Sequence, residues 1–402
     1  ETTANISVLN ITNPEVFKDF VSIAHANNCS AAISVGGWDG SLYFSTAVAT
    51  AENRTAFVKT LTNLVQDNNL DGLDFDWESP GLPGVGCNTR SPNDTSNYLA
   101  FLKELRIALP KASISAAAAI RTFVSPDQST PSTNVSEFAS VFDYIALMNY
   151  AAWGPWSTSV GPKAPLNDTC VANATNRLGS AVSAVKAWAS AGIPVDQLVL
   201  GVPTVGQGYS VSPSDAFTAN GTLGVYVPFN KTFTPRGDAW DEVLAPGTLD
   251  VCGKPEVLVS GSWDFWGLVA EGFLNENGAA NTATGIAYRY DKCSQTPYVY
   301  NKTSGVMVSY DNARSFAAKG SFIQTFGLRG FSIWEAGGDF NDILLDSIRS
   351  SAGFPEVNPN EEECGGTTII VPTTTISVSA TDTSSVSTLT STADPAEGYK
   401  ED

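Results

Sequence analysis

Three carboxylates stand at alternate positions in one short segment of the chain. Asp74, Asp76 and Glu78 are separated by Phe and Trp, and a Leu precedes them. Side chains of a β-strand alternate between its two faces, so the carboxylates would share one face and the apolar residues the other. Neighbouring anions with no Lys or Arg among them raise one another's pKa, which is more typical of a proton-transfer site than of a structural strand. The segment therefore predicts an active-site strand.

Two other interpretations fit part of this segment. An acidic surface strand is one, but the Leu, Phe and Trp on the other face favour a strand that packs on a core. A calcium-binding EF-hand loop is the second, because Asp67 and Glu78 stand at its first and twelfth places. An EF-hand needs a helix after the loop, and the run Ser79-Pro-Gly-Leu-Pro-Gly84 prevents one. We therefore expect no metal site here.

Composition sets the outer limits. The chain has 402 residues, 43% of them hydrophobic, which is enough for one large core with a smaller domain. Its net charge of −19 argues against nucleic acid as a partner. No apolar run is long enough for a membrane span. The single histidine, His25, is expected on a helix surface and rules out a Ser-His-Asp triad or a His-rich metal site. We expect no cofactor and a monomer.

Sequence signals predict secretion. Eleven Asn-X-Ser/Thr sequons occur, more than composition alone would give, and six cysteines occur without a Cys-X-X-Cys pair. Disulfides are therefore expected, with Cys252–Cys293 and Cys87–Cys170 as the hypothesis, although the sequence does not fix the pairing. Residues 355–402 contain Ser/Thr tracts that cannot form a core, so we expect a disordered, O-glycosylated stalk that leaves cell-wall association open.

Short apolar strands alternate with amphipathic helices, the pattern of a parallel α/β sheet. The strands are expected at 31–35, 72–77, 114–119, 144–148, 198–202 and 330–333, with helices including 97–109 and 178–189. The stretch 207–308 interrupts this rhythm, is rich in aromatic residues and Gly, and predicts an inserted subdomain. The expected domains are a catalytic barrel of residues 1–206 and 309–354, the insertion 207–308 and the tail 355–402.

Four segments together resemble the family-18 glycoside hydrolases, the chitinase family. Asp71-Gly-Leu-Asp-Phe-Asp-Trp-Glu78 is similar to the DGxDxDxE signature of that family, and Ser34-Val-Gly-Gly37 to its SxGG strand. Met148-Asn-Tyr150 resembles the MxY strand, and the strand ending at Trp334 the last one. The resemblance runs in order from about residue 10 to 350. Its loops are similar to those of secreted fungal members.

The resemblance implies a (β/α)₈ TIM barrel, an α/β fold, with its active site at the carboxyl ends of the strands. Only one good strand precedes the signature, so we expect a barrel that lacks about its first two β/α units and hence a fragment of a longer precursor. It also implies a small α+β insertion before the last helix–strand unit, which in relatives walls one side of the substrate site.

The resemblance also assigns roles. It implies retaining hydrolysis of chitin, the β-1,4-linked polymer of N-acetylglucosamine, in which the acetamido oxygen of the substrate is the nucleophile. Glu78 would be the general acid and then the general base. Asp76 would accept a hydrogen bond from the acetamido N–H, and Asp74 would share a proton with Asp76 and Glu78. Tyr150 would donate a hydrogen bond to the acetamido oxygen. Further expected substrate-binding residues are Trp334, Trp38, Met148, Trp153 and Ser34.

Three positions depart from the family pattern. Ala151 replaces the Asp that follows the MxY tyrosine, which predicts lower activity or a shifted pH optimum. Val205 and Gln207 replace the Tyr and Arg of the seventh strand. The expected partner is chitin or its oligosaccharides. Two alternatives stay open: a chitin-binding lectin without catalysis, and an endo-β-N-acetylglucosaminidase acting on N-glycan cores.

Overall fold

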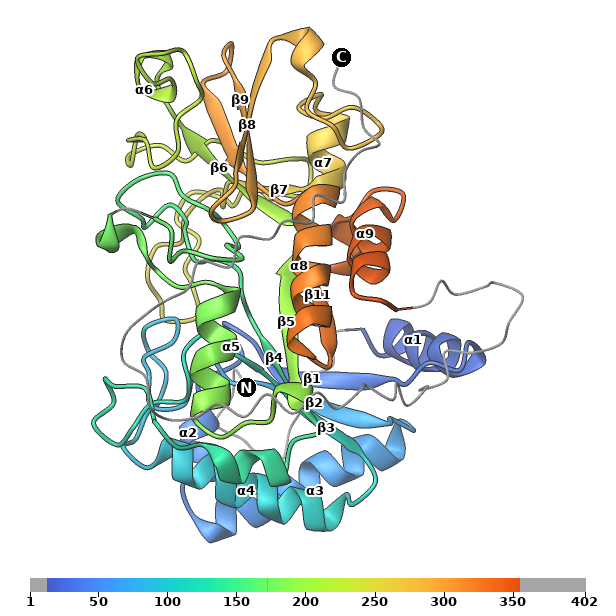
Figure 1. Ribbon diagram of the computed structural model, residues 1–402. Helices are drawn as coiled ribbons and strands as arrows, with labels where there is room; N and C mark the ends of the chain where they lie inside the picture. Colours follow the sequence, from blue (N-terminus) through green and yellow to red (C-terminus); the bar gives the residue numbers. More distant parts are fainter. Residues whose placement is uncertain (1–12, 172, 355–402) are drawn as a thin grey trace, which may run out of the picture. The chain divides into compact units, whose positions relative to one another are not determined.

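A six-stranded parallel sheet carries the predicted active-site strand (Figure 1). The computed structural model describes residues 13–171 and 173–354, so the predicted stalk lies outside the described residues. The sheet has the order β1-β2-β3-β4-β5-β11. Its strands are β1 (Ala32–Gly36), β2 (Gly72–Asp76), β3 (Ser113–Ala118), β4 (Tyr144–Leu147), β5 (Leu198–Pro203) and β11 (Gly330–Trp334). All six predicted strands are confirmed to within two residues at either end.

Helices lie between most successive strands of this sheet, as parallel pairing requires. They are α2 (Phe44–Val48) and α3 (Ala51–Asp67) between β1 and β2, α4 (Asp94–Ala108) between β2 and β3, α5 (Ala181–Ser190) between β4 and β5, and α8 (Ala313–Phe326) before β11. Helix α1 (Pro14–Ala26) precedes β1, α9 (Ile343–Ser351) follows β11, and α6 (Pro213–Ala216) and α7 (Phe265–Ala270) belong to the stretch between β5 and β11. Helix α3 begins where the Thr50 side chain accepts the Asn53 N–H at 3.2 Å, an N-cap, and it ends before β2. Strand β2 follows and a Pro-Gly loop comes after it, so this segment is a helix–strand unit and not a helix–loop–helix.

Strand β2 separates an apolar face from an acidic one, as its alternation predicts. Leu73, Phe75 and Trp77 are at most 3% exposed. Phe75 meets Phe101 of α4 edge to face at 5.5 Å, and Trp77 stacks on Phe44 of α2 at 5.1 Å. Such aromatic contacts add to the burial of large apolar surfaces. The helices α2, α3 and α4 therefore hold one face of β2, and the carboxylates are left on the other.

A second, antiparallel sheet lies between β5 and β11 in the chain, which confirms the predicted α+β insertion. Its order is β7-β6-β10-β9-β8. The strands are β6 (Val205–Ser210), β7 (Ser262–Asp264), β8 (Ile286–Asp291), β9 (Thr296–Asn301) and β10 (Val306–Ser309). Only Thr204 separates β6 from β5, so the insertion begins directly at the carboxyl end of a barrel strand. Tyr209, Tyr300 and Met307 contribute to its separate core.

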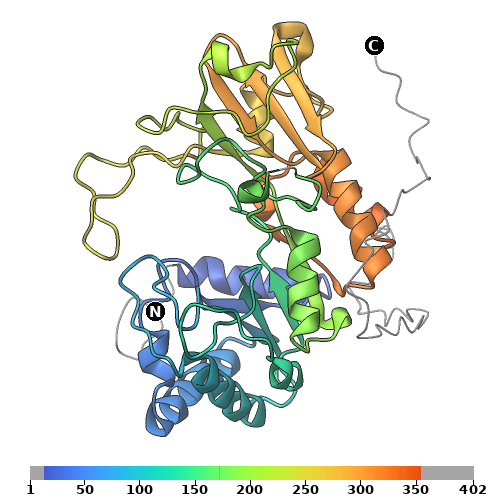
Figure 2. The same cartoon turned by 60° about the vertical axis from the view of Figure 1, so that its left-hand side comes forward.

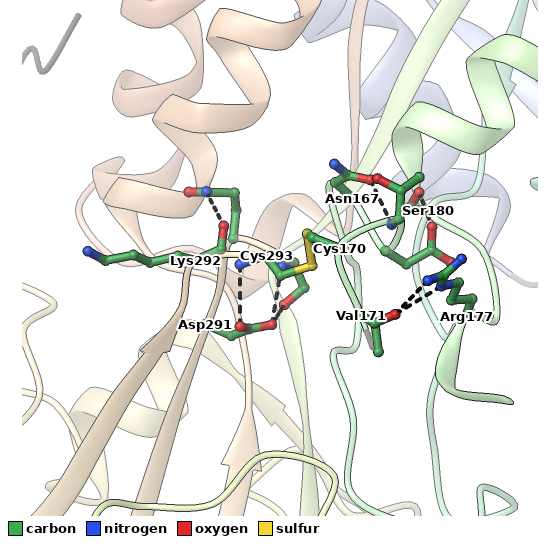
Figure 3. The surroundings of a disulfide bond; sticks show 12 residues. Asn167, Cys170, Val171, Arg177, Ser180, Asp291, Lys292 and Cys293 are labelled. Atoms are coloured by element: carbon green, nitrogen blue, oxygen red, sulfur yellow. Dashed lines mark hydrogen bonds between the residues drawn. A yellow bond between two sulfur atoms is a disulfide. The ribbon is translucent and has the colours of Figure 1, made fainter. Parts of the chain in front are cut away.

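The disulfide prediction is wrong in both pairs. Cys87 is bonded to Cys252 and Cys170 to Cys293, with Cα–Cα distances of 5.7 and 5.8 Å that suit a disulfide. Figure 3 shows the second of these, between the loop after β4 and the β8–β9 turn. The prediction paired cysteines within the barrel and within the insertion. The fold instead brings loops of the insertion against loops of the barrel, so each disulfide joins the two.

Candidate active site

Asp74 is held by a serine on each neighbouring strand. Ser34 of β1 and Ser115 of β3 are its partners in the strand register. Their hydroxyls donate to the two carboxylate oxygens of Asp74 at 2.7 and 2.6 Å. The two hydrogen bonds fix the orientation of the Asp74 carboxylate. Ser34 therefore positions Asp74, while its contact with substrate stays a prediction, and Ser115 is a partner of Asp74 that the sequence analysis missed.

Asp76 and Glu78 retain protons more strongly than ordinary carboxylates do. Burial, with the charges of Glu78 and Asp74, raises the pKa of Asp76 to about 7. One oxygen of Asp76, Oδ1, is buried without a hydrogen-bond partner among the described residues. Burial, and then the nearby charge of Asp39, raises the pKa of Glu78. We refer to Asp74, Asp76 and Glu78 as the carboxylate row; within it, Asp76 keeps its proton up to about neutral pH.

The SxGG segment fixes the end of β2. Gly36 has φ of +116°, and a Cβ there would lie 2.3 Å from the Asp76 carbonyl oxygen, so only glycine fits. Ser41 continues this loop, and its hydroxyl lies 2.9 Å from the Asp76 carbonyl oxygen and accepts the Glu78 N–H at 3.1 Å. The backbone on both sides of Trp77 is thereby held, which fixes where the Glu78 side chain begins. Nothing in the sequence marked Ser41 as a residue of the site except its position shortly after Gly36 and Gly37.

Tyr150 lies close to the carboxylate row. Its pKa is raised by burial first and then by the charges of Asp76, Glu78 and Asp74, which requires the phenol to lie near them. The ring packs against Gly201 of β5, where a Cβ would come within 3.1 Å of it. Ala151 follows with φ of +52°, a left-handed conformation that Asn and Asp adopt more readily than Ala does. The structure thus brings together the predicted residues of β2 and β4.

The predicted aromatic residues divide into two groups. Trp38 and Trp334 are 54% and 61% exposed, so their rings are open to a ligand. Trp153 is 1% exposed and packs on Tyr226 at 5.3 Å. The prediction that Trp153 binds substrate is wrong for this structure, because a buried ring offers no face to a sugar. Met148 is partly buried at the end of β4 and remains a predicted contact.

A second group of carboxylates lies beside Trp334. Glu335 follows β11, and its backbone is tied to Thr204 by hydrogen bonds of 2.7 and 3.1 Å. Asp264, at the end of β7, has its pKa raised to about 7 by burial and by the charges of Asp238 and Glu335. The sequence analysis missed both residues, because Asp264 reaches this place only through the pairing of β7 with β6.

A carboxylate row at the carboxyl end of a parallel β-strand, beside exposed tryptophans, is an arrangement typical of glycoside hydrolases built on the (β/α) plan. Residues 2–339 match the family model for glycosyl hydrolases family 18. The chain belongs to this family.

Known proteins support the same assignment. A "chitinase-like effector" of Moniliophthora roreri is 48% identical over 345 residues, which are 85% of this chain and 82% of that protein. Chitinase A1 of Niallia circulans is 30% identical over 80% of this chain and 42% of its own length. The crystal structure of a chitinase from Rhizomucor miehei superimposes with a TM-score of 0.78 and 33% identity, covering 88% of this chain and 92% of that one.

Proposed function

We propose that this protein hydrolyses chitin and its oligosaccharides with retention of configuration, using the substrate's acetamido group as nucleophile. The observation that carries this proposal is the carboxylate row at the carboxyl end of β2, where Ser34 and Ser115 hold Asp74 and burial raises the pKa of Asp76. Enzymes named chitinase among the relatives and solved structures support the substrate class.

In the proposed first step, Glu78 donates a proton to the glycosidic oxygen, and the bond from that oxygen to C1 breaks. The acetamido oxygen attacks C1 and forms an oxazolinium intermediate, while Asp76 accepts a hydrogen bond from the acetamido N–H. Tyr150 donates to the acetamido oxygen and orients it. In the second step Glu78 takes a proton from water, and the water oxygen attacks C1. The bond from C1 to the acetamido oxygen breaks, which opens the oxazolinium ring. Two inversions at C1 give net retention.

The test is a comparison of two tetrasaccharides that differ at the acetamido group. We expect cleavage of the N-acetylglucosamine tetramer and no cleavage of cellotetraose, which lacks the internal nucleophile. Chromatography of the products with anomer resolution would also show retention. Cleavage of both substrates at similar rates would contradict the mechanism.

Chitin binding without hydrolysis is a second candidate. Two observations favour it: Ala151 stands where the family has an Asp, and two relatives carry the name "chitinase-like effector". Retention of the tetramer on the protein without turnover would decide for this candidate.

The pH dependence of catalysis is expected to follow the carboxylate row. Because the pKa of Asp76 is raised to about 7, Asp76 loses its proton as pH rises through that value, and kcat/KM should fall there. Replacing Asp39 by Asn removes a charge that raises the pKa of Glu78, the proposed acid, so Glu78 should lose its proton at lower pH. The alkaline limb should then also move to lower pH, by a small amount because Asp39 is exposed and screened.

The measurement is a pH profile of kcat/KM for both proteins. Asp196→Asn is the matched control, because Asp196 is exposed and precedes β5 at the opposite end of the strands. An alkaline limb that moves upward in Asp39→Asn, or moves equally in Asp196→Asn, would contradict this explanation.

We propose that the protein acts outside the cell. Its two described disulfides suit an oxidising compartment. Sequon residues Asn134 and Asn230 are exposed and use Oδ1 in hydrogen bonds to the third residue of the sequon, whereas Asn53 donates its amide to the Thr46 carbonyl from within α3. No helix of the described residues is long and apolar enough to cross a membrane. Recovery from the source organism only within cells would contradict this placement.

A further inference from the structure

A hairpin of the insertion, residues 242–259, extends away from the antiparallel sheet; we refer to it as the strap. Its two arms are joined by backbone hydrogen bonds from Leu244 to Leu258, Glu256 to Thr248 and Asp250 to Lys254, all between 2.8 and 2.9 Å. Figure 2 shows it descending from the insertion toward the loop that follows β2.

The base of the strap is fixed by buried polar groups. Asp241 is 6% exposed, and its carboxylate accepts the N–H groups of Gly237, Ser260 and Gly261 at 2.7 to 2.9 Å. The two ends of the strap are thereby held together. Gln207, the residue that replaces the family's Arg, donates its amide to the Ser260 and Gly261 carbonyls at 3.1 and 3.3 Å. A residue that departs from the family pattern thus supports the base of the strap.

The tip of the strap is fixed by one disulfide. Cys252 is bonded to Cys87 in the loop after β2. The next residue in that loop, Asn88, reaches the Glu78 carbonyl oxygen at 3.5 Å. The arms themselves contribute little packing, because five of their apolar side chains are 42% to 72% exposed; these are Val243, Leu249, Val251, Val257 and Leu258. The disulfide is therefore the main constraint on the position of the tip.

The two fixed points lie at different parts of the sheet. The base follows Trp240, whose ring would meet a Cβ on Gly337, just after β11, at 3.3 Å. The tip lies at the loop after β2. Three strands, β3, β4 and β5, separate β2 from β11 in the sheet. The strap therefore runs between the strand ends that carry Glu78 and Trp334.

We propose that the strap restricts which glycosidic bonds reach Glu78, so that chain ends and short oligosaccharides enter while the interior of a long chain does not. This inference rests on the proposed function. A short oligosaccharide can enter lengthwise beneath a segment fixed at both ends. An internal bond of a polymer requires the strap to move aside, and the disulfide opposes that motion.

Loss of the disulfide should therefore change access for long chains only. If the open strap rises from a minor population of about a tenth to most molecules, attack on internal bonds increases about tenfold. Cleavage of the tetramer should stay within about twofold, because it does not depend on the open state.

The experiment uses the double variant Cys87→Ser/Cys252→Ser. Loss of viscosity of a soluble high-molecular-weight chitin derivative reports internal cleavage, and release of product from the tetramer reports basal activity. We expect the ratio of the two rates to rise about tenfold. Cys170→Ser/Cys293→Ser is the matched control: it removes a disulfide of comparable sequence separation, 123 against 165 residues, and should leave the ratio unchanged. An unchanged ratio in the first variant, or an equal rise in both, would overturn the proposal.

Two further measurements test the same proposal by other routes. Should the first variant fold poorly, removal of residues 245–257 together with Cys87→Ser should give the same rise, because Leu244 and Leu258 are already neighbours across the hairpin. Association rates of labelled tetramer and polymer on a Glu78→Gln background test access without hydrolysis, and the polymer rate alone should increase about tenfold. Failure of the intact protein to bind either ligand would refute the proposed function itself, and the strap inference with it.

Discussion

Glu78→Gln is expected to lower hydrolysis of the N-acetylglucosamine tetramer by roughly 10²- to 10⁴-fold, the range of a lost general acid–base group. Glutamine has nearly the same size and can still form hydrogen bonds, but it has no acidic proton to give to the leaving oxygen. The Ser41 contact to the Glu78 N–H involves the backbone, so it remains in the variant. We therefore expect kcat to fall while binding of the tetramer persists.

The measurement combines kinetics with calorimetric binding of the tetramer. Glu137→Gln is the matched control, since this carboxylate is 68% exposed and pairs with Lys103 on the surface. Its kinetics should equal those of the unmodified protein. A Glu78→Gln protein that retains more than about a tenth of the rate would show that another group supplies the proton.

Lys319→Ala is expected to lower the free energy of unfolding by about 3–5 kcal/mol. Lys319 lies in α8, and Asp311 lies just before the first residue of that helix. The two form an ion pair of 2.7 Å, and their side chains are 0% and 2% exposed. Burial lowers the pKa of Lys319, and the charge of Asp311 opposes this. Truncation would leave the Asp311 carboxylate buried without its cation, and α8 packs against both α9 and the core.

Urea denaturation followed by intrinsic fluorescence measures this loss. Lys18→Ala is the control, because the Lys18–Glu15 pair on α1 is 67% and 83% exposed, and pairs of that kind contribute about 1 kcal/mol or less. A second variant, Lys319→Met with Asp311→Asn, removes both charges and should be less destabilised than Lys319→Ala. Equal losses for Lys319→Ala and Lys18→Ala would contradict the assigned importance of the buried pair.

Much of the fold could be predicted because its signals are local. Each strand of the parallel sheet is a short apolar run, and the run is visible without knowing its neighbours. Side-chain alternation alone places Leu73, Phe75 and Trp77 on the strand face opposite the carboxylates. The burial of these three residues confirms it. The order of all six strands in the sheet then follows their order in the chain, with the insertion lying between β5 and β11.

The candidate site was only partly predictable. The motifs predicted Glu78, Asp76, Asp74 and Tyr150 as residues of one site, and the charges of the carboxylates raise the pKa of Asp76 and of Tyr150. Their catalytic roles remain a proposal that the variants above test. Ser115, Asp264 and Cys252 at the tip of the strap carried no local signal, because each meets its partner only through the pairing of distant segments.

The sequence by itself determined the carboxylate row and its position at the end of a buried strand. Side-chain alternation has a period of two residues, so five residues are enough to specify it. Only the tertiary structure decided the disulfide partners, the burial of Trp153 and the course of the strap. Those properties depend on which distant segments meet: the disulfides join cysteines 123 and 165 residues apart, and Trp153 packs on Tyr226. A cysteine or tryptophan has the same local sequence whether it meets one distant segment or another.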